Sequence, residues 1–312
     1  MNYKSFSDLS KDIKSNLHKI PKDVSLVVGI PRSGLLAANL MAIYLNLPLT
    51  DIDSFIKGQI LSSCFRADGF EDNAFKGKIL IVDDSVATGK AIVDAKEKLA
   101  DIIAQQQFQL LFCCVYADPE KQHLVDIPLL TLGRPRVFEW NLFHNKVMEK
   151  ACVDIDGVLC IDPTEEENDD GEKYLEFLLN ANPHILPKRK INTLVTTRLE
   201  KYRSNTEDWL KRHGIEYNEL VMLNLPDKAT RKKMNNRGAY KAAEFKKRKN
   251  NVLFIESDRR QALKIHELSG KDVYCVDTNE MFSGNTNRFS RVLLNNSRRL
   301  YKKFRKVLKS FF

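Results

Sequence analysis

Ile79–Ala91 reads ILIVDDSVATGKA, and this stretch decides the fold of the first half of the chain. Its apolar start predicts a buried strand, which Asp83 and Asp84 follow directly. A short turn then reaches Gly89 and opens a helix. Backbone N–H groups at a helix start bind phosphate, and adjacent carboxylates accept hydrogen bonds from sugar hydroxyls. The stretch therefore favours a sugar-phosphate site over the plainer alternative, a helix N-cap formed by Asp84 or Ser85.

A second loop, GIPRSG at Gly29–Gly34, follows the apolar run Val24–Ile30. In this order and spacing, the two loops resemble those of type I phosphoribosyltransferases, which use phosphoribosyl pyrophosphate (PRPP). The resemblance implies that Asp83 and Asp84 hold the 2- and 3-hydroxyls of the ribose. It also implies that Mg²⁺ and Arg32 stabilise the departing pyrophosphate. The other PRPP contacts that it implies are Ser33, Gly34, Ser85, Val86, Ala87, Thr88, Gly89 and Lys90, with Arg66 as a further candidate in the family's closing loop.

The acceptor of the transferred sugar is not evident from the sequence. Gly133–Asn145 reads GRPRVFEWNLFHN and is rich in aromatic and polar residues. It could form a hood over the acceptor, or it could be a packed joint between domains. The residues that would line such a hood are Arg136, Glu139, Trp140 and His144.

The second half of the chain opens with VDIDGVL at Val153–Leu159, directly after a predicted strand. Asp154 and Asp156 flank one residue, so an extended turn points both carboxylates to one side, and Gly157 allows the sharp bend beyond. One carboxylate can attack phosphorus while the other protonates the leaving oxygen. The motif resembles the first motif of haloacid dehalogenase-type (HAD-type) phosphatases.

Three further motifs occur in the order of that phosphatase family. The resemblance implies that Thr196 binds phosphate and that Lys241 balances charge, with Lys246 and Lys247 as rivals for the lysine. It implies a Mg²⁺ site as well. The ligands of this metal would come from Asp154, Asp156, Glu256 and Asp258, and the division between the last two is left open.

Strand and helix patterns alternate through both halves, which predicts an α/β fold with two domains. Each domain is expected to be a mainly parallel sheet flanked by helices. The predicted boundaries are 1–147 for the phosphoribosyltransferase-like domain, 148–282 for the HAD-like domain and 283–312 for a tail. Thr206–His213, followed by Gly214, is expected to be a helix that ends at a glycine.

The net charge of +9 is concentrated in the tail, because residues Ser283–Phe312 contain nine Lys and Arg residues and no Asp or Glu. Their apolar residues recur at helical spacing and end in Phe311 and Phe312, which predicts a basic amphipathic helix lying on an anionic membrane surface. A helix that packs on a partner, or a tail that binds nucleic acid, is the alternative reading.

Nothing near Met1 reads as a signal peptide, and no apolar run is long enough to cross a membrane. The six cysteines form no CxxC pair, which is typical of a reducing cytoplasm. We therefore expect a cytoplasmic protein held at the inner face of the cytoplasmic membrane. Its oligomeric state is left open.

The pairing of the two halves resembles fused phosphoribosyltransferase–phosphatase proteins of bacterial surface-polysaccharide assembly. It implies a bifunctional ribofuranosyltransferase that transfers 5-phosphoribose from PRPP to a lipid-linked glycan and then removes the 5-phosphate. A tethered phosphatase would act at high effective concentration. The alternatives are a soluble nucleobase phosphoribosyltransferase with a fused nucleotide phosphatase, and a regulator that senses PRPP.

Overall fold

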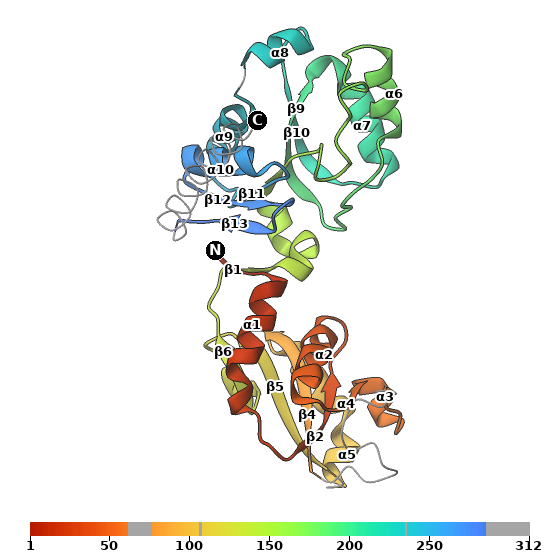
Figure 1. The fold of residues 1–312 in the computed structure, drawn as a ribbon, viewed down its shortest axis with the longest axis vertical. Helices are drawn as coiled ribbons and strands as arrows, with labels where there is room; N and C mark the ends of the chain where they lie inside the picture. The colour runs from red at the N-terminus through yellow and green to blue at the C-terminus, as the bar shows by residue number, and fades with distance from the viewer. Residues whose placement is uncertain (62–76, 106–107, 235, 285–312) are drawn as a thin grey trace, which may run out of the picture. The chain divides into compact units, whose positions relative to one another are not determined.

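The computed structural model describes residues 1–61, 77–105, 108–234 and 236–284, and it divides the chain into two compact units. The first unit is Met1–Trp140 and the second begins at Asn141 (Figure 1). The boundary expected from the sequence lies a few residues later. The short 3₁₀ helices η4 (Glu139–His144) and η5 (Lys146–Lys150) occupy the interval.

The first unit contains a five-stranded, wholly parallel sheet with the order β3-β2-β4-β5-β6. Its strands are β2 (Val24–Gly29), β3 (Leu49–Asp51), β4 (Lys78–Val86), β5 (Gln109–Ala117) and β6 (Ile127–Thr131). Two short strands, β1 (Asn2–Lys4) and β7 (Arg136–Phe138), form a separate parallel pair.

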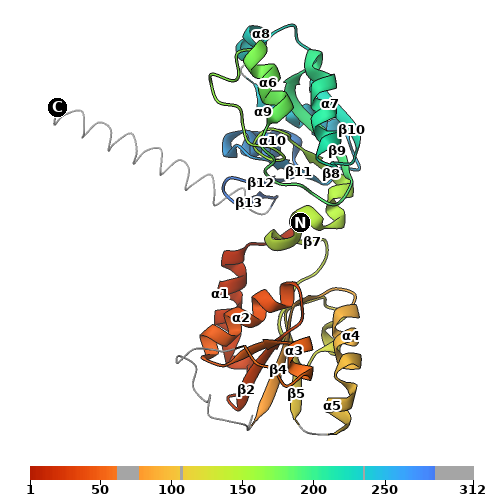
Figure 2. The ribbon, with the colours of Figure 1, turned by 90° about the vertical axis from the view of Figure 1, so that its right-hand side faces the viewer.

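Helices cover both faces of this sheet because the residues of β4 alternate between two cores. Leu80 and Val82 pack with α1 (Phe6–Asn16) and α2 (Ser33–Leu45). Ile79 and Ile81 pack with α3 (Ile52–Ile56) and α4 (Lys90–Lys98), and α5 (Ala100–Ala104) adds to the same side. Figure 2 shows the strands between these two sets of helices.

Strand β4 is longer than the sequence suggested. Its pairing with β5 continues through Asp83, Ser85 and Val86, so the two carboxylates lie inside the strand rather than in the turn after it. The helix predicted to open after Gly89 is divided into α4 and α5 at Leu99, a residue whose side chain is fully buried.

The second unit contains a six-stranded sheet with the order β10-β9-β8-β11-β12-β13. All neighbours are parallel except the antiparallel pair β12 and β13. The strands are β8 (Ala151–Val153), β9 (Ile191–Leu199), β10 (Tyr217–Leu223), β11 (Leu253–Glu256), β12 (Asp272–Cys275) and β13 (Glu280–Phe282).

Helices lie on both sides of this sheet too. Phe245 of α9 (Arg237–Lys247) and Ile265 of α10 (Arg259–Ser269) share a buried core with Phe254 of β11. Figure 1 shows α6 (Glu172–Asn180) and α7 (Arg203–Arg212) on the other side of β9 and β10. The remaining elements are α8 (Lys228–Met234) and the 3₁₀ helices η1 (Leu17–Lys19), η3 (Gln122–Leu124) and η6 (Glu200–Tyr202).

The predicted fold class, α/β with parallel sheets flanked by helices, is confirmed. The expected helix near Thr206 is α7, and Gly214 follows it with a positive φ of 64°. Arg66 and residues 285–312, which include nearly all of the expected amphipathic tail, lie outside the described residues. No helix in the described parts of the chain is long and apolar enough to cross a membrane.

Candidate active sites

The first candidate site lies where β4 ends beside the start of α2. The side chains of Asp83 and Asp84 are both buried. Ser33 Oγ donates to one carboxylate oxygen of Asp84 at 2.8 Å, and Trp140 Nε1 donates to the other at 2.8 Å. The structure thus joins the two predicted loops through Asp84, whose oxygens both have partners within the unit.

Burial also changes the protonation of Asp83. Desolvation, followed by the charge of Asp84, raises the pKa of Asp83 to about 8. Asp83 Oδ1 accepts the backbone N–H of Asp84 at 2.9 Å. A carboxyl with this pKa is mostly protonated at neutral pH, so Asp83 can donate as well as accept a hydrogen bond.

The predicted phosphate loop surrounds a small cavity of about 110 Å³. Its lining residues include all six predicted contacts from Ser85 to Lys90. Gly89 has a φ of 87° and stands at the N-cap of α4. Gly34 is required for a different reason, because an added Cβ would come within 2.8 Å of the Val82 carbonyl oxygen. Arg32 is exposed at the N-cap of α2.

Two arginines that follow β6 support the phosphate loop. Arg136 Nη2 donates to the Val86 carbonyl at 2.7 Å, and Arg134 Nη2 donates to the Ala87 carbonyl at 2.7 Å. Arg134 also pairs with Asp118 at 2.7 Å. The sequence analysis named Arg136 only as a hood residue and missed Arg134. The sequence feature that points to Arg134 is its position in Gly133–Asn145, the polar segment that follows β6.

The other expected hood residues divide between the two units. Trp140 stacks on Phe138 with ring centroids 4.8 Å apart, and Glu139 accepts the backbone N–H of Phe6. His144 belongs to the second unit, where its carbonyl accepts a hydrogen bond from Arg189. Among the predicted hood residues, Trp140 contacts Asp84, a carboxylate that is predicted to bind PRPP.

A larger cavity of about 510 Å³ shares the phosphate-loop residues Ala87 and Thr88 with the smaller one. The rest of its lining is mainly charged and polar, with Asp118, Pro119, Glu120, Lys121, Gly133 and Arg134. No aromatic side chain is among these described lining residues.

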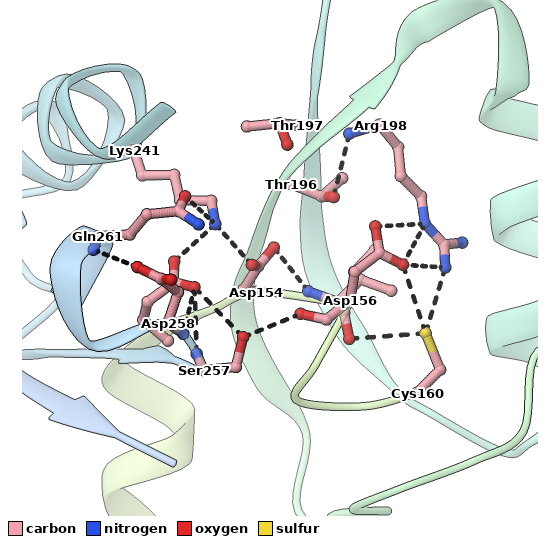
Figure 3. A network of polar contacts seen from close by, with 12 residues as sticks. Asp154, Asp156, Cys160, Thr196, Thr197, Arg198, Lys241, Ser257, Asp258 and Gln261 are labelled. Atoms are coloured by element: carbon pink, nitrogen blue, oxygen red, sulfur yellow. Dashed lines mark hydrogen bonds and ion pairs between the residues drawn. The ribbon is translucent and has the colours of Figure 1, made fainter. Parts of the chain in front are cut away.

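The second candidate site is centred on a buried lysine (Figure 3). Lys241 Nζ donates to Asp154 Oδ2 at 2.6 Å and to Glu256 Oε2 at 2.6 Å. The three side chains come from α9, the end of β8 and the end of β11, and all are buried. The rivals Lys246 and Lys247 are exposed, and Lys247 pairs with Glu244 of its own helix.

The three charges of this cluster depend on one another. Burial raises the pKa of Glu256 to about 8 and also raises that of Asp154. Burial alone would lower the pKa of Lys241, but the charges of Asp154 and Glu256 outweigh it and raise that pKa. Lys241 therefore stays protonated, and its charge stabilises the ionised carboxylates in a poorly solvated place.

Asp156 is held by an arginine that the sequence analysis missed. Arg198, with no exposed surface, donates from Nη2 to Asp156 Oδ1 at 2.6 Å and from Nε to the same oxygen at 3.1 Å. Burial opposes ionisation of Asp156, but the Arg198 charge outweighs it and lowers the pKa of Asp156. The signal was present in the sequence, since Arg198 lies two residues after the predicted threonine in the same strand.

The threonines of β9 differ in their surroundings. Thr196 Oγ1 is fully buried and accepts the backbone N–H of Arg198 at 3.2 Å, which leaves its hydroxyl hydrogen free for another acceptor. Thr197, which was not predicted, is a lining residue of the pocket described below.

The two acids of β11 and its following turn have separate structural roles. Glu256 binds Lys241 through one oxygen and accepts the Ser257 backbone N–H through the other at 3.1 Å. Asp258 is the N-cap of α10, where Oδ1 accepts the Gln261 backbone N–H at 2.8 Å. Carboxylate oxygens suit Mg²⁺. Both oxygens of Glu256 already accept hydrogen bonds, whereas Asp258 caps α10 through Oδ1. Within the described residues, no cluster of three or more His, Cys, Asp or Glu side chains forms a metal site.

These residues line a polar pocket of about 290 Å³, called the second-unit pocket below. Its lining includes Asp154, Asp156, Lys241, Glu256 and Asp258, and so gathers all but Thr196 of the predicted residues of this site. Lining residues that the sequence analysis did not name include Asp162, Asn168, Tyr174, Arg231 and Arg237. They come from loops and helices without a recognised motif, so only the folded arrangement identifies them.

Residues 3–150 match the family model described as "Phosphoribosyl transferase domain". The chain therefore carries a phosphoribosyltransferase domain. This confirms the prediction of such a domain in the first half of the chain. The match covers slightly less than half of the chain, and no curated protein matches it.

Solved structures similar to the chain cover 45% of it. One is a purine phosphoribosyltransferase from Pyrococcus horikoshii, with 18% identity, a TM-score of 0.32 and 92% of that chain covered. Another is a xanthine-guanine-hypoxanthine phosphoribosyltransferase from Helicobacter pylori, with 13% identity, a TM-score of 0.32 and 92% covered. A third is a hypothetical protein from Neisseria gonorrhoeae with bound ppGpp, with 16% identity, a TM-score of 0.31 and 89% covered.

Proposed function

We propose that this chain is a bifunctional ribofuranosyltransferase, which transfers 5-phosphoribose from PRPP to a lipid-linked glycan and then removes the 5-phosphate. The observation that carries the proposal is a second, separate set of reactive side chains in a chain that has a phosphoribosyltransferase domain. Lys241, Asp154 and Glu256 form that set at the carboxyl end of a parallel sheet. Ligands bind preferentially at this end of such sheets.

The first step would take place at β4. Asp83 and Asp84 would bind the ribose hydroxyls, with the sugar competing with Ser33 and Trp140 for the Asp84 oxygens. The residues from Ser85 to Lys90 would hold the 5-phosphate in their cavity. Arg32, exposed beside Ser33, would neutralise the pyrophosphate as the bond at the anomeric carbon breaks. Mg²⁺, when bound with PRPP, would share that charge.

The second step would take place in the second-unit pocket and resembles HAD-type chemistry. Asp154 would attack phosphorus to form an aspartyl phosphate, and water would then hydrolyse it. Burial raises the pKa of Asp154, and the charge of Lys241 opposes this effect and so favours the ionised nucleophile. Arg198 favours the ionised form of Asp156, which suits a base that activates the water. Asp156 would have to take up a proton with the substrate in order to protonate the leaving oxygen. Mg²⁺ held by Asp154 and Asp258 would offset the phosphoryl charge.

The character of the acceptor is proposed from the 510 Å³ cavity beside the phosphate loop. Two carboxylates and two cations of its lining can hydrogen-bond to hydroxyl groups, as a polyhydroxylated sugar requires. The basic tail supports an acceptor at a membrane, since nine cations and apolar residues at helical spacing suit an anionic lipid surface. We propose that the protein acts in the cytoplasm, at the inner face of the cytoplasmic membrane.

A nucleobase acceptor is the second candidate, favoured by one feature. The rings of Tyr116, Phe138 and Trp140 are stacked, and Trp140 is hydrogen-bonded to Asp84. Aromatic side chains next to a ribose site are suited to a flat base. In this case the product would be a nucleoside, released after the second unit removed the phosphate.

An acceptor assay separates these candidates. The full chain, with Mg²⁺ and ribose-labelled PRPP, is given lipid-linked glycans extracted from the source organism, or a mixture of nucleobases. The proposal predicts label in the lipid-linked fraction, and less of it when residues 283–312 are deleted. Label in nucleosides, with none in lipid and no effect of the deletion, would establish the second candidate instead.

A further inference from the structure

The second-unit pocket contains a buried cation that the steps above do not use. Arg231 lies in α8, only 5% of its surface is exposed, and its side chain lines the pocket that contains Asp154 and Lys241. A buried guanidinium needs an explanation, because removing an ionised group from water is costly unless charge and hydrogen bonds compensate it.

The contacts of Arg231 within the chain are neutral. Nη1 donates to the Thr197 carbonyl at 3.1 Å, and Nη2 donates to the Asn168 side-chain oxygen at 3.0 Å. No carboxylate forms an ion pair with Arg231 in the part of the chain that the structure describes. Its Nε–H is buried and has no acceptor in hydrogen-bonding geometry among the same residues.

The other buried cations of this region have anionic partners. Arg198 is paired with Asp156, and Lys241 is shared by Asp154 and Glu256. Arg237, which also lines the pocket, is exposed to solvent. Arg231 therefore combines a buried, uncompensated charge with a donor that is left open.

We propose that Arg231 is a phosphate-binding residue of the second-unit pocket, whose guanidinium binds a phosphoryl oxygen of the substrate. This inference rests on the proposed phosphatase function. Its contacts with Thr197 and Asn168 fix the plane of the guanidinium, so the group is oriented before the substrate arrives. A charge-assisted hydrogen bond to phosphate would supply the missing acceptor and the missing negative charge.

The consequence for specificity is a preference for dianionic phosphate monoesters. Lys241 is already neutralised by carboxylates, so Arg231 supplies buried positive charge in addition to the exposed Arg237. Phosphate diesters, with one charge fewer and a second substituent, would gain less from the contact.

The test is a calorimetric titration of the full-length protein with inorganic phosphate in the presence of Mg²⁺. The variants are Arg231→Gln and Arg231→Lys, with Lys232→Gln as the matched control, because Lys232 is exposed on the same helix. The phosphate loop of the first unit offers another binding place, so each variant is compared with the unaltered chain. We expect Arg231→Gln to lower the phosphate affinity of one class of binding sites about 10- to 100-fold. We expect Arg231→Lys to weaken it less, and Lys232→Gln to leave it unchanged.

Thermal unfolding in phosphate-free buffer tests whether Arg231 has only a structural role. Arg231→Gln removes a buried charge that has no ion-pair partner among the described residues, along with neutral hydrogen bonds, so its midpoint should stay close to that of the unaltered chain. Added phosphate should raise that midpoint less in Arg231→Gln than in the control. Coincident isotherms for all the proteins, or a lower midpoint in Arg231→Gln with phosphate binding retained, would overturn the proposal.

Hydrolysis of ribose 5-phosphate separates this inference from the proposed function. If the unaltered chain hydrolyses it and Arg231→Gln does so with the same KM and kcat, only the role of Arg231 fails. If the unaltered chain does not hydrolyse it but loses phosphate binding on substitution of Arg231, the phosphatase assignment fails and the anion site stands.

Discussion

At the scale of single residues, the protein uses buried charges in pairs that depend on each other. Arg198 and Asp156 form such a pair, and so do Lys241 and its two carboxylates. Removing one partner of a buried pair leaves the other uncompensated. The pairs therefore make sensitive tests of the site geometry.

Arg198→Ala should lower the free energy of unfolding of the second unit by about 3–5 kcal/mol, because Asp156 would lose its buried partner. Denaturant unfolding measures this. The control is Arg260→Ala, at an exposed position of α10, where a change within about 0.5 kcal/mol is expected. Equal effects of the two substitutions would show that the Asp156 contact does not stabilise the unit.

We expect the first unit to become less stable as the pH rises, because Asp83 loses a proton that the folded state binds tightly. Its pKa is about 8 in the folded protein and near 3.8 when unfolded, so the folded state binds this proton more tightly. The stabilisation is present below the unfolded pKa and is lost as the pH rises through the folded pKa. Between pH 6 and 9 the loss amounts to about 2.7 kcal/mol. Unfolding measured across this range should show the loss in the unaltered chain and not in Asp83→Asn.

At the scale of the elements, the ends of parallel strands place each set of reactive groups. Strand β4 delivers the first carboxylate pair, and strands β8, β9 and β11 deliver the second set. The turn after β8 is closely packed. Gly157 has a φ of 75°, and an added Cβ would lie 2.3 Å from Ser257 Oγ.

Gly157→Ala should reduce phosphatase activity at least about tenfold, since a 1 Å displacement of a reacting group can cost about 100-fold. Phosphoribosyl transfer should be unchanged. Gly214→Ala is the matched control, because its φ of 64° is also positive but an added Cβ meets nothing within 4 Å. An active Gly157→Ala variant would mean that this turn does not position Asp154 and Asp156.

The strands that carry the sites could be predicted from the sequence, but most contacts of the site residues with distant segments could not. Apolar runs followed by carboxylates located β4 and β8, because burial and strand ends leave a local pattern. Contacts between distant segments leave none. Trp140 reaches Asp84, and Arg231 reaches Thr197 and Asn168, only once the chain has folded.

At the scale of the whole molecule, we propose two successive reactions, one for each unit of the chain. The phosphoribosyltransferase domain within residues 3–150 supports the first reaction. The buried cluster around Lys241 is the basis for the second. The boundary of the units could be predicted only approximately, because short helical turns rather than a flexible linker occupy residues 139–150.

The most direct test measures the mass of the product from three forms of the full chain, incubated with PRPP, Mg²⁺ and the acceptor fraction that takes up label. The forms are the unaltered chain, Asp154→Asn, and the double variant Asp83→Asn/Asp84→Asn. We predict a ribosylated product from the unaltered chain and the same product with one additional phosphate from Asp154→Asn. We predict no product from the double variant. A product from Asp154→Asn that lacks the phosphate would contradict the assignment of the second reaction to this chain.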